Sequence, residues 1–212
     1  MATDTGAFIV FCGLDGSGKS LQADLLAQYL KRAGRQTVVT GQPTSWYKDS
    51  PLARRFFDTF QADPMEIAAL ALLSAADRLK HIHEVVTPGR QAGHIVLCTR
   101  YYLSAYAYFP ERGLDATDWL RNINRYAPIP DITFLLDIPA HVAQARVRNR
   151  DHSLRLEEEQ LAHMEAIRQR FLAFDEPCYY ILDGTAAPEL IHQRVLQHVE
   201  PFLQKTSGKD YF

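Results

Sequence analysis

The feature that most constrains this chain is a glycine-rich stretch that directly follows an apolar run near its start. Residues 7–12 are apolar, and residues 13–20 read Gly-Leu-Asp-Gly-Ser-Gly-Lys-Ser, which fits the pattern G-x-x-x-x-G-K-[ST] of a phosphate-binding loop, or P-loop. Leucines then recur at helical spacing over residues 21–30. Because the stretch lies between an expected strand and an expected helix, we predict a nucleoside triphosphate site rather than an ordinary glycine-rich turn.

The chemistry of this loop follows from its residue types. Glycines let backbone N–H groups turn toward phosphate oxygens, and the N-terminus of the following helix adds positive potential. Lys19 is expected to reach the β- and γ-phosphates, and Ser20 to ligate the Mg²⁺ that accompanies ATP. The loop residues predicted to bind ATP are Gly13, Leu14, Asp15, Gly16, Ser17, Gly18, Lys19 and Ser20.

Short apolar runs alternate with helical patterns along the rest of the chain. The runs are nearly continuous in apolar residues, which is typical of parallel strands covered on both faces. We therefore predict an α/β fold, a three-layer α/β/α arrangement around a five-stranded parallel sheet of the P-loop kinase type. Strands are expected at 7–12, 37–40, 94–98, 132–136 and 178–182, with helices at about 20–34, 63–86, 116–126, 139–148, 157–174 and 187–204.

Composition limits the classes of protein that the chain can belong to. Its 212 residues, 47% hydrophobic and 23% charged, fit one globular domain, expected over 1–204 with a flexible tail at 205–212. The net charge of -2 argues against nucleic-acid or membrane partners. Cys12, Cys98 and Cys178 lie in or beside apolar runs, so we expect buried thiols and a cytoplasmic protein. The eight histidines show no metal-ligand spacing.

Several stretches beyond the P-loop together resemble the thymidylate kinase family. They extend in the family's order over most of the chain, which makes the resemblance far more specific than a P-loop alone. Enzymes of that family transfer the γ-phosphoryl group of ATP to dTMP. The stretches are residues 8–22, Asp77-Arg78, Thr99-Arg100-Tyr101, Ser104, Ala107-Tyr108, residues 130–137, and an arginine-rich segment from Arg146 to Arg155 followed by Glu157.

The resemblance assigns roles to individual residues. Asp15 matches the position that meets the acceptor sugar or the metal, and Arg100 the arginine that holds the acceptor phosphate. Arg78 matches the residue that reads the pyrimidine O4. Ser104 and Tyr108 are expected beside the sugar and base.

A lid over residues 146–156 is also implied by the resemblance. Ser17 occupies a P-loop position where some relatives carry an arginine, so the family pattern requires the transition-state arginine to come from the lid. Arg150 and Arg155 are the best candidates for that task, and Arg146 is expected to contact ATP. The predicted catalytic set is thus Asp15, Lys19, Arg100, Arg150 and Arg155.

The chain departs from the family pattern at positions that concern the acceptor or the metal. Gly41 and Gln42 replace an arginine and a glutamate, Thr99 replaces an aspartate, Ser74 the phenylalanine that stacks on thymine, and Phe109 a glutamine. A kinase with another small acceptor, or a weakly active nucleotide-binding protein, therefore remain alternatives. Aromatic residues that could rebuild the acceptor pocket are Phe109, Trp46, Tyr47, Tyr101, Tyr102 and Tyr106.

The resemblance further implies a homodimer formed through long helices. The helix that follows Asp63 contains the small apolar run Ala68-Ala69-Leu70-Ala71, which suits close helix packing. Burial of this run inside the monomer is the alternative.

Overall fold

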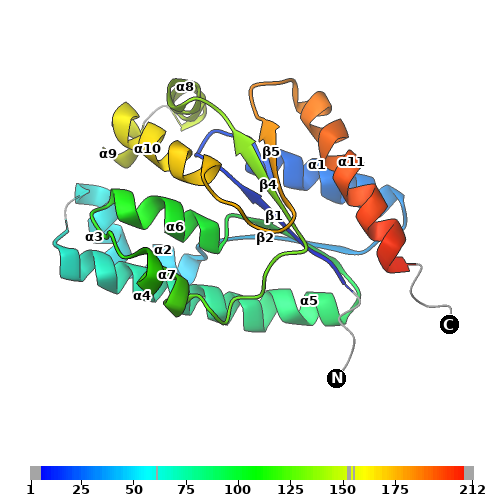
Figure 1. The fold of residues 1–212 in the computed structure, drawn as a ribbon, viewed down its shortest axis with the longest axis horizontal. Helices are drawn as coiled ribbons and strands as arrows, with labels where there is room; N and C mark the ends of the chain where they lie inside the picture. The colour runs from blue at the N-terminus through cyan, green and yellow to red at the C-terminus, as the bar shows by residue number, and fades with distance from the viewer. Residues whose placement is uncertain (1–5, 61, 152–153, 155, 208–212) are drawn as a thin grey trace.

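The computed structural model describes residues 6–60, 62–151, 154 and 156–207. Its centre is a five-stranded parallel sheet in the order β2-β3-β1-β4-β5 (Figure 1). Helices cover both faces, so the predicted α/β class and parallel sheet are confirmed. The strands are β1 (Phe8–Cys12), β2 (Thr37–Gly41), β3 (Ile95–Thr99), β4 (Ile132–Asp137) and β5 (Tyr179–Asp183).

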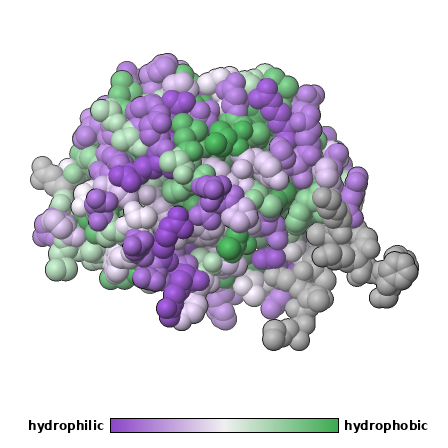
Figure 2. All heavy atoms as spheres, in the orientation of Figure 1, coloured by the Kyte–Doolittle hydropathy of each residue, from purple (hydrophilic) through white to green (hydrophobic). Residues whose placement is uncertain are grey.

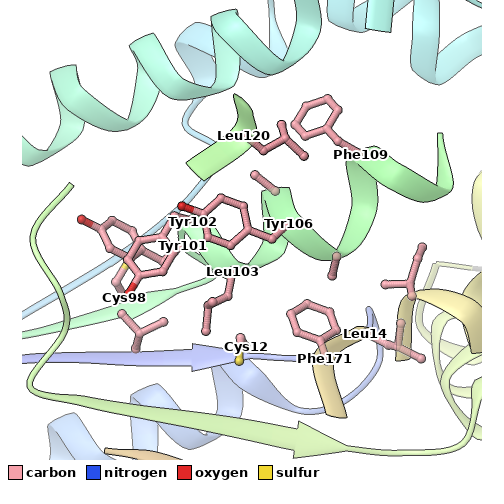
Figure 3. Close-up of a cluster of buried hydrophobic side chains, with 14 of the residues drawn as sticks. Cys12, Leu14, Cys98, Tyr101, Tyr102, Leu103, Tyr106, Phe109, Leu120 and Phe171 are labelled. Atoms are coloured by element: carbon pink, nitrogen blue, oxygen red, sulfur yellow. The ribbon is translucent and has the colours of Figure 1, made fainter. Parts of the chain in front are cut away.

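Successive residues of a strand point to opposite faces of the sheet, and both faces of this sheet are apolar. Ile9 and Phe11 of β1 pack with α1 (Lys19–Arg32) and α11 (Pro188–Ser207) on one face. Phe8 and Val10 pack into a larger cluster on the other face. This second cluster includes tyrosines that line the space above β1 (Figure 3).

The helices on the second face come from the middle of the chain (Figure 1). α4 begins with a capping box, because Asp63 accepts a hydrogen bond from the N–H of Glu66 and Pro64 follows it. α4 continues without a break through the π-helical turn η1 into α5. The helices on the second face are α2 (Ser45–Lys48), α3 (Pro51–Thr59), α4 (Pro64–His81), η1 (Ile82–Val86), α5 (Thr87–Gln91), α6 (Tyr102–Glu111), α7 (Thr117–Ile123), α8 (Ala140–Asp151), α9 (Leu156–Glu159) and α10 (Leu161–Leu172).

Several expectations need correction. The helix expected over 157–174 is two helices, separated at Gln160. The helix expected over 187–204 continues to Ser207, and the remainder of the expected tail, 208–212, lies outside the described residues. Cys178 is exposed, not buried, and lies directly before the edge strand β5. No periodic pattern predicts α6, whose residues are almost all apolar and include Pro110.

The molecular surface mixes hydrophilic residues with small hydrophobic groups on the face shown in Figure 2. Over the described ranges, none of the helices combines the length and the apolar character needed to cross a bilayer.

Candidate active site

Two adjoining pockets open at the carboxyl ends of the strands, where ligands bind in open α/β sheets. The P-loop pocket has a volume of about 670 Å³ and lies over residues 15–21. The inner pocket has a volume of about 350 Å³ and lies between α2, α4, α6 and the segment around α9. The two pockets share part of their walls, formed by Asp15, Gln42, Pro43, Lys48, Arg100 and Arg150.

The P-loop has open space where its backbone turns into α1. Gly18 precedes the helix with a left-handed backbone (φ 96°), which only glycine adopts without strain. No atom lies within 4 Å of the place where a Cβ would stand on Gly18. The hydroxyl of Ser17 is buried and has no hydrogen-bond partner among the described residues. The hydroxyl of Ser17 without a partner and the open space at Gly18 suit a bound phosphate.

Lys19 folds back onto this loop. Its Nζ donates to the carbonyl oxygens of Leu14 (2.6 Å) and Gly13 (3.2 Å) and lies 3.6 Å from Oδ1 of Asp15. Burial, assisted by the positive charge of Arg100, lowers the pKa of Lys19 to about 8, although Asp15 acts in the opposite direction. The ammonium group is therefore poised to gain from a nearby anion.

Arg100 forms the second half of this charged cluster. Its Nη2 lies 2.5 Å from Oδ1 of Asp15 and donates to Oη of Tyr108 (3.3 Å), with the guanidinium 5.1 Å from the centre of that ring. Burial alone would lower the pKa of Arg100, but Asp15 and Tyr108 more than offset it and raise the pKa. The backbone of Arg100 is left-handed (φ 65°), a conformation that costs on the order of 1 kcal/mol and is often found at functional sites.

Arg78 lies at the other end of the inner pocket and is surrounded by neutral partners. Its Nη1 donates to Oε1 of Gln42 (3.0 Å), and its Nε donates to Oδ1 of Asn124 (3.0 Å). Nη2 lies 3.5 Å from the hydroxyl of Ser74. Arg78 is 3% exposed, and burial lowers its pKa.

A buried histidine fixes the orientation of the Gln42 amide. Because Oε1 of Gln42 accepts from Arg78, its amide nitrogen must donate to Nδ1 of His81 (2.9 Å). The proton of the neutral ring then resides on Nε2, which donates to the hydroxyl of Thr40 (2.7 Å). Burial lowers the pKa of His81, which favours the neutral ring.

The carboxylate of Glu157 in α9 contacts Arg112, at the C-terminal end of α6, and His163 of α10. Arg112 donates to both oxygens of Glu157 (2.8 Å each), and His163 lies 3.3 Å from Oε1. Burial would raise the pKa of Glu157, but Arg112 and His163 lower it to about 2. Aromatic rings also surround the guanidinium of Arg112, at 5.0 to 5.8 Å: Phe56, Phe57, Tyr108 and Phe109.

Most residues predicted for the site come together. Arg146 lines the P-loop pocket and donates to the carbonyl oxygens of Gly184 (2.9 Å) and Gly16 (3.4 Å). Arg150 lines both pockets. Arg155 lies outside the described residues. The residues predicted to bind the acceptor all line the inner pocket: Asp15, Ser74, Arg78, Arg100, Ser104, Tyr108 and Phe109.

Sequence reasoning missed part of the inner pocket. Of the aromatic candidates, Phe109, Tyr47 and Tyr101 line it, whereas Trp46, Tyr102 and Tyr106 do not. The hydroxyl groups of Tyr101 and Ser104 are buried without a hydrogen-bond partner among the described residues. Phe57, Lys48 and Arg112 also line the pocket. In the sequence, only their aromatic or cationic character indicates that they could contact a ligand.

Two departures from the family pattern are neighbours in space. Gly41 of β2 pairs with Thr99 of β3, and a Cβ on Gly41 would stand 2.4 Å from Oγ1 of Thr99. Residues 41 and 99 are therefore sterically coupled, since a side chain at 41 would require the hydroxyl of Thr99 to move.

Comparison with known proteins agrees with this geometry. Residues 11–195 match the family model described as "Thymidylate kinase". The chain is similar to the "Probable thymidylate kinase" of Thermococcus onnurineus strain NA1, with 37% identity over 93% of this chain and 99% of that protein. It is 34% identical to the "Thymidylate kinase" of Thermomicrobium roseum over 93% of this chain and 96% of that protein. Identity to the "Thymidylate kinase" of Desulfotalea psychrophila is 29%, over 96% and 99%.

Proposed function

Because the chain belongs to the thymidylate kinase family, we propose that it transfers the γ-phosphoryl group of ATP to a nucleoside monophosphate, with a dTMP-like acceptor. The observation that supports this most is the wall shared by two pockets. A triphosphate over residues 13–20 and an acceptor in the inner pocket would meet beside Asp15 and Arg100. Phosphoryl transfer needs such alignment and positive charge more than it needs covalent help from the protein.

Each charged residue has a task in this proposal. Lys19 exchanges its contacts with loop carbonyls for the β- and γ-phosphates, and Arg100 holds the acceptor phosphate. Asp15 accepts a hydrogen bond from the acceptor sugar or neighbours the metal. Arg150 or Arg155 of the lid, over 146–156, stabilises charge on the phosphoryl group in transit.

Recognition of the acceptor base is assigned to Arg78. A guanidinium has five N–H groups, so Arg78 can keep Gln42 and Asn124 as partners and still donate to a base oxygen. The buried hydroxyl groups of Ser104 and Tyr101, which have no partner among the described residues, supply further hydrogen bonds. Ser74 and Phe109 complete the wall next to Tyr108.

Mg²⁺ bound with ATP is the proposed metal, and Ser20 its protein ligand. Within the described ranges, no group of three His, Cys, Asp or Glu residues could hold a metal ion. This fits Mg²⁺ in kinases, which is held chiefly by substrate phosphates and water with few protein ligands. Ser20 is exposed at the first turn of α1 and lines the P-loop pocket, so its hydroxyl can join such a set. Mg²⁺ neutralises phosphate charge when bound.

We also propose a homodimer in the cytoplasm. Met65, Leu72 and Leu79 of α4 are 78%, 50% and 37% exposed, and their spacing of seven residues places them along one helix face. A second copy of α4 would cover this stripe. Sedimentation at the mass of one chain across micromolar concentrations would refute the dimer. The free, buried thiols of Cys12 and Cys98 suit a reducing compartment.

The function is tested by measuring ADP release from ATP with a panel of deoxynucleoside monophosphates, ribonucleoside monophosphates and nucleosides. We expect the highest kcat/KM with dTMP. Preference for a nucleoside would instead identify a kinase with another acceptor. ATP binding without release on any acceptor would identify a nucleotide-binding protein.

Two variants separate the pockets in the same assay. Lys19→Ala should lower turnover with every acceptor by about 10²- to 10³-fold, as expected when a group that stabilises transition-state charge is lost. Arg100→Ala should lower turnover only with phosphorylated acceptors. Lys80→Ala, which removes an exposed lysine paired with Glu84, is the control. Unchanged turnover of monophosphates by Arg100→Ala would contradict the role given to Arg100.

A further inference from the structure

The segment from Gly41 to Lys48 passes from one pocket to the other. Gly41 and Thr44 line the P-loop pocket, Tyr47 lines the inner pocket, and Lys48 lines both. Lys48 is the only cationic residue among residues 41–48. It is also one of the shared-wall residues where the two substrates of the proposed reaction would meet.

Position 41 carries no side chain in this chain. A Cβ there would stand 2.4 Å from Oγ1 of Thr99 and 3.3 Å from its carbonyl oxygen. The parallel register of β2 and β3 pairs these two residues directly, so a side chain at 41 would require the hydroxyl of Thr99 to move. The cation of residues 41–48 is therefore the one at residue 48.

The backbone at Lys48 is held firmly by the residues before it. The side chain of Thr44 caps α2 by accepting from the N–H of Trp46, and the carboxylate of Asp77 accepts from both the N–H and the hydroxyl of Thr44. The N–H of Lys48 in turn donates to the carbonyl oxygen of Thr44 (3.1 Å). Tyr47 is 2% exposed and packs edge-on against Phe57. These contacts hold α2 in place, and the side chain of Lys48 extends from its last residue.

The ammonium group of Lys48 differs from two other cations of the pockets, Lys19 and Arg100. Lys19 and Arg100 both lie against Asp15, whereas Lys48 is exposed and makes no ion pair with any residue that the structure describes. The two substrates would bring several negative charges to this place, and Asp15 adds another. An exposed ammonium group without an ion pair among the described residues suits a phosphate group that arrives with the substrate.

We propose that Lys48 is a catalytic residue that binds the acceptor phosphate and the phosphoryl group in transit. This inference rests on the proposed function. An oxygen atom of the acceptor monophosphate forms a bond to the γ-phosphorus, the bond from that phosphorus to the β,γ-bridging oxygen breaks, and ADP leaves with the bonding electrons. Lys48 transfers no proton. It stabilises the negative charge on the acceptor phosphate, the γ-phosphoryl group and the β-phosphate of the leaving ADP.

The test compares Lys48→Met, which keeps length but removes charge, with Lys48→Arg, which keeps charge. Lys80→Met on α4, outside both pockets, is the matched control. We expect Lys48→Met to lower kcat/KM for the acceptor about a hundredfold, Lys48→Arg to retain most activity, and Lys80→Met to match the wild type. ATP affinity without acceptor should change little. Activity of Lys48→Met within threefold of wild type, with folding verified by circular dichroism, would overturn the proposal.

A second measurement separates this inference from the proposed function. If the wild type turns over no monophosphate, the proposed function fails, and binding of inorganic phosphate to the protein saturated with Mg²⁺ and ADP decides the role of Lys48. We expect at least about fivefold weaker binding by Lys48→Met, since a charge-assisted contact is lost. Equal dissociation constants for the wild type and Lys48→Met would overturn the role of Lys48 as a phosphate ligand.

Discussion

The two ends of the inner pocket each hold a buried arginine, but they balance its charge in opposite ways. At the phosphate end, Arg100 is paired with the carboxylate of Asp15, which raises its pKa. At the base end, Arg78 contacts the neutral groups of Gln42, Asn124 and Ser74, and burial lowers its pKa.

This contrast suggests different purposes for the two arginines. A carboxylate beside Arg100 can be exchanged for the oxygen atoms of a phosphate, because water reaches Asp15, whose side chain is 34% exposed. The partners of Arg78 include the amides of Gln42 and Asn124, each only 4% exposed. We infer that the base end is a rigid part of the core, whereas the phosphate end rearranges when substrates bind.

The largest expected effect comes from removing the charge at the base end. Arg78→Met leaves Oε1 of Gln42 and Oδ1 of Asn124 buried without this donor, at about 1–3 kcal/mol for each. We expect the free energy of unfolding to fall by about 3 kcal/mol. Arg100→Met should cost only about 1 kcal/mol, since Asp15 keeps Lys19 and water.

Urea denaturation of both variants, with the wild type in the same buffer, measures this difference. A larger loss of stability for Arg100→Met than for Arg78→Met would reverse the comparison, and the base end would then not be the rigid part. Gln42→Ala in the Arg78→Met background provides the control, because it removes one of the two unsatisfied oxygens and should recover part of the loss.

The second effect concerns why the phosphate end lacks the arginine and aspartate of the family pattern. Gly41→Ala places a methyl group 2.4 Å from Oγ1 of Thr99, and we expect a loss of about 1–3 kcal/mol. Adding Thr99→Ala should recover at least about 0.5 kcal/mol through coupling of the two sites. Thr99→Val, which keeps an atom in the same place, should give no recovery.

Calorimetric melting temperatures of the three single and two double variants test this coupling. Additive losses for Gly41→Ala and Thr99→Ala would show that the strands adjust freely at residue 41. The contact with Thr99 would then be no obstacle to a cation at residue 41, and a cation there could take the role proposed for Lys48.

The two ends also differ in how far the sequence alone could predict them. The P-loop was predictable from a contiguous motif between a strand and a helix, whereas Arg100 and Tyr108 were assigned through the resemblance to the family. Arg78 was predicted as an isolated residue, but its partners were not. Asn124 is 46 residues away from Arg78 in the chain, and no local pattern connects the two.

Other residues were missed for a related reason. The spacing of His81 in the sequence gave no indication of its contact with Gln42. Arg112 and Glu157, which form a hydrogen-bonded ion pair, lie 45 residues apart in the sequence. Local periodicity identifies elements and their apolar faces, whereas long-range polar contacts depend on the final packing of α4, α6 and α9.

The smallest expected effect is a pH dependence confined to the phosphate end. Below pH 8 the amine of Lys19 is protonated with or without ATP, so affinity for ATP should be flat. Above pH 8 the free protein loses this proton, because burial and Arg100 lower the pKa of Lys19 to about 8. Binding must then take a proton up, and affinity should fall with rising pH, toward about tenfold per pH unit.

Isothermal titration calorimetry with Mg²⁺ and ATP at pH 7 and pH 9, in two buffers of different ionisation enthalpy, measures this proton uptake directly. Lys19→Arg is the matched control, because arginine stays protonated over this range and should abolish the slope. The neighbouring Tyr108 and Cys12 have pKa values raised to about 12, so neither titrates in this window. His81 at the base end has a lowered pKa and titrates on the acid side. A slope that persists in Lys19→Arg would therefore place the titrating group elsewhere, and would mean that Asp15 keeps Lys19 charged despite its burial.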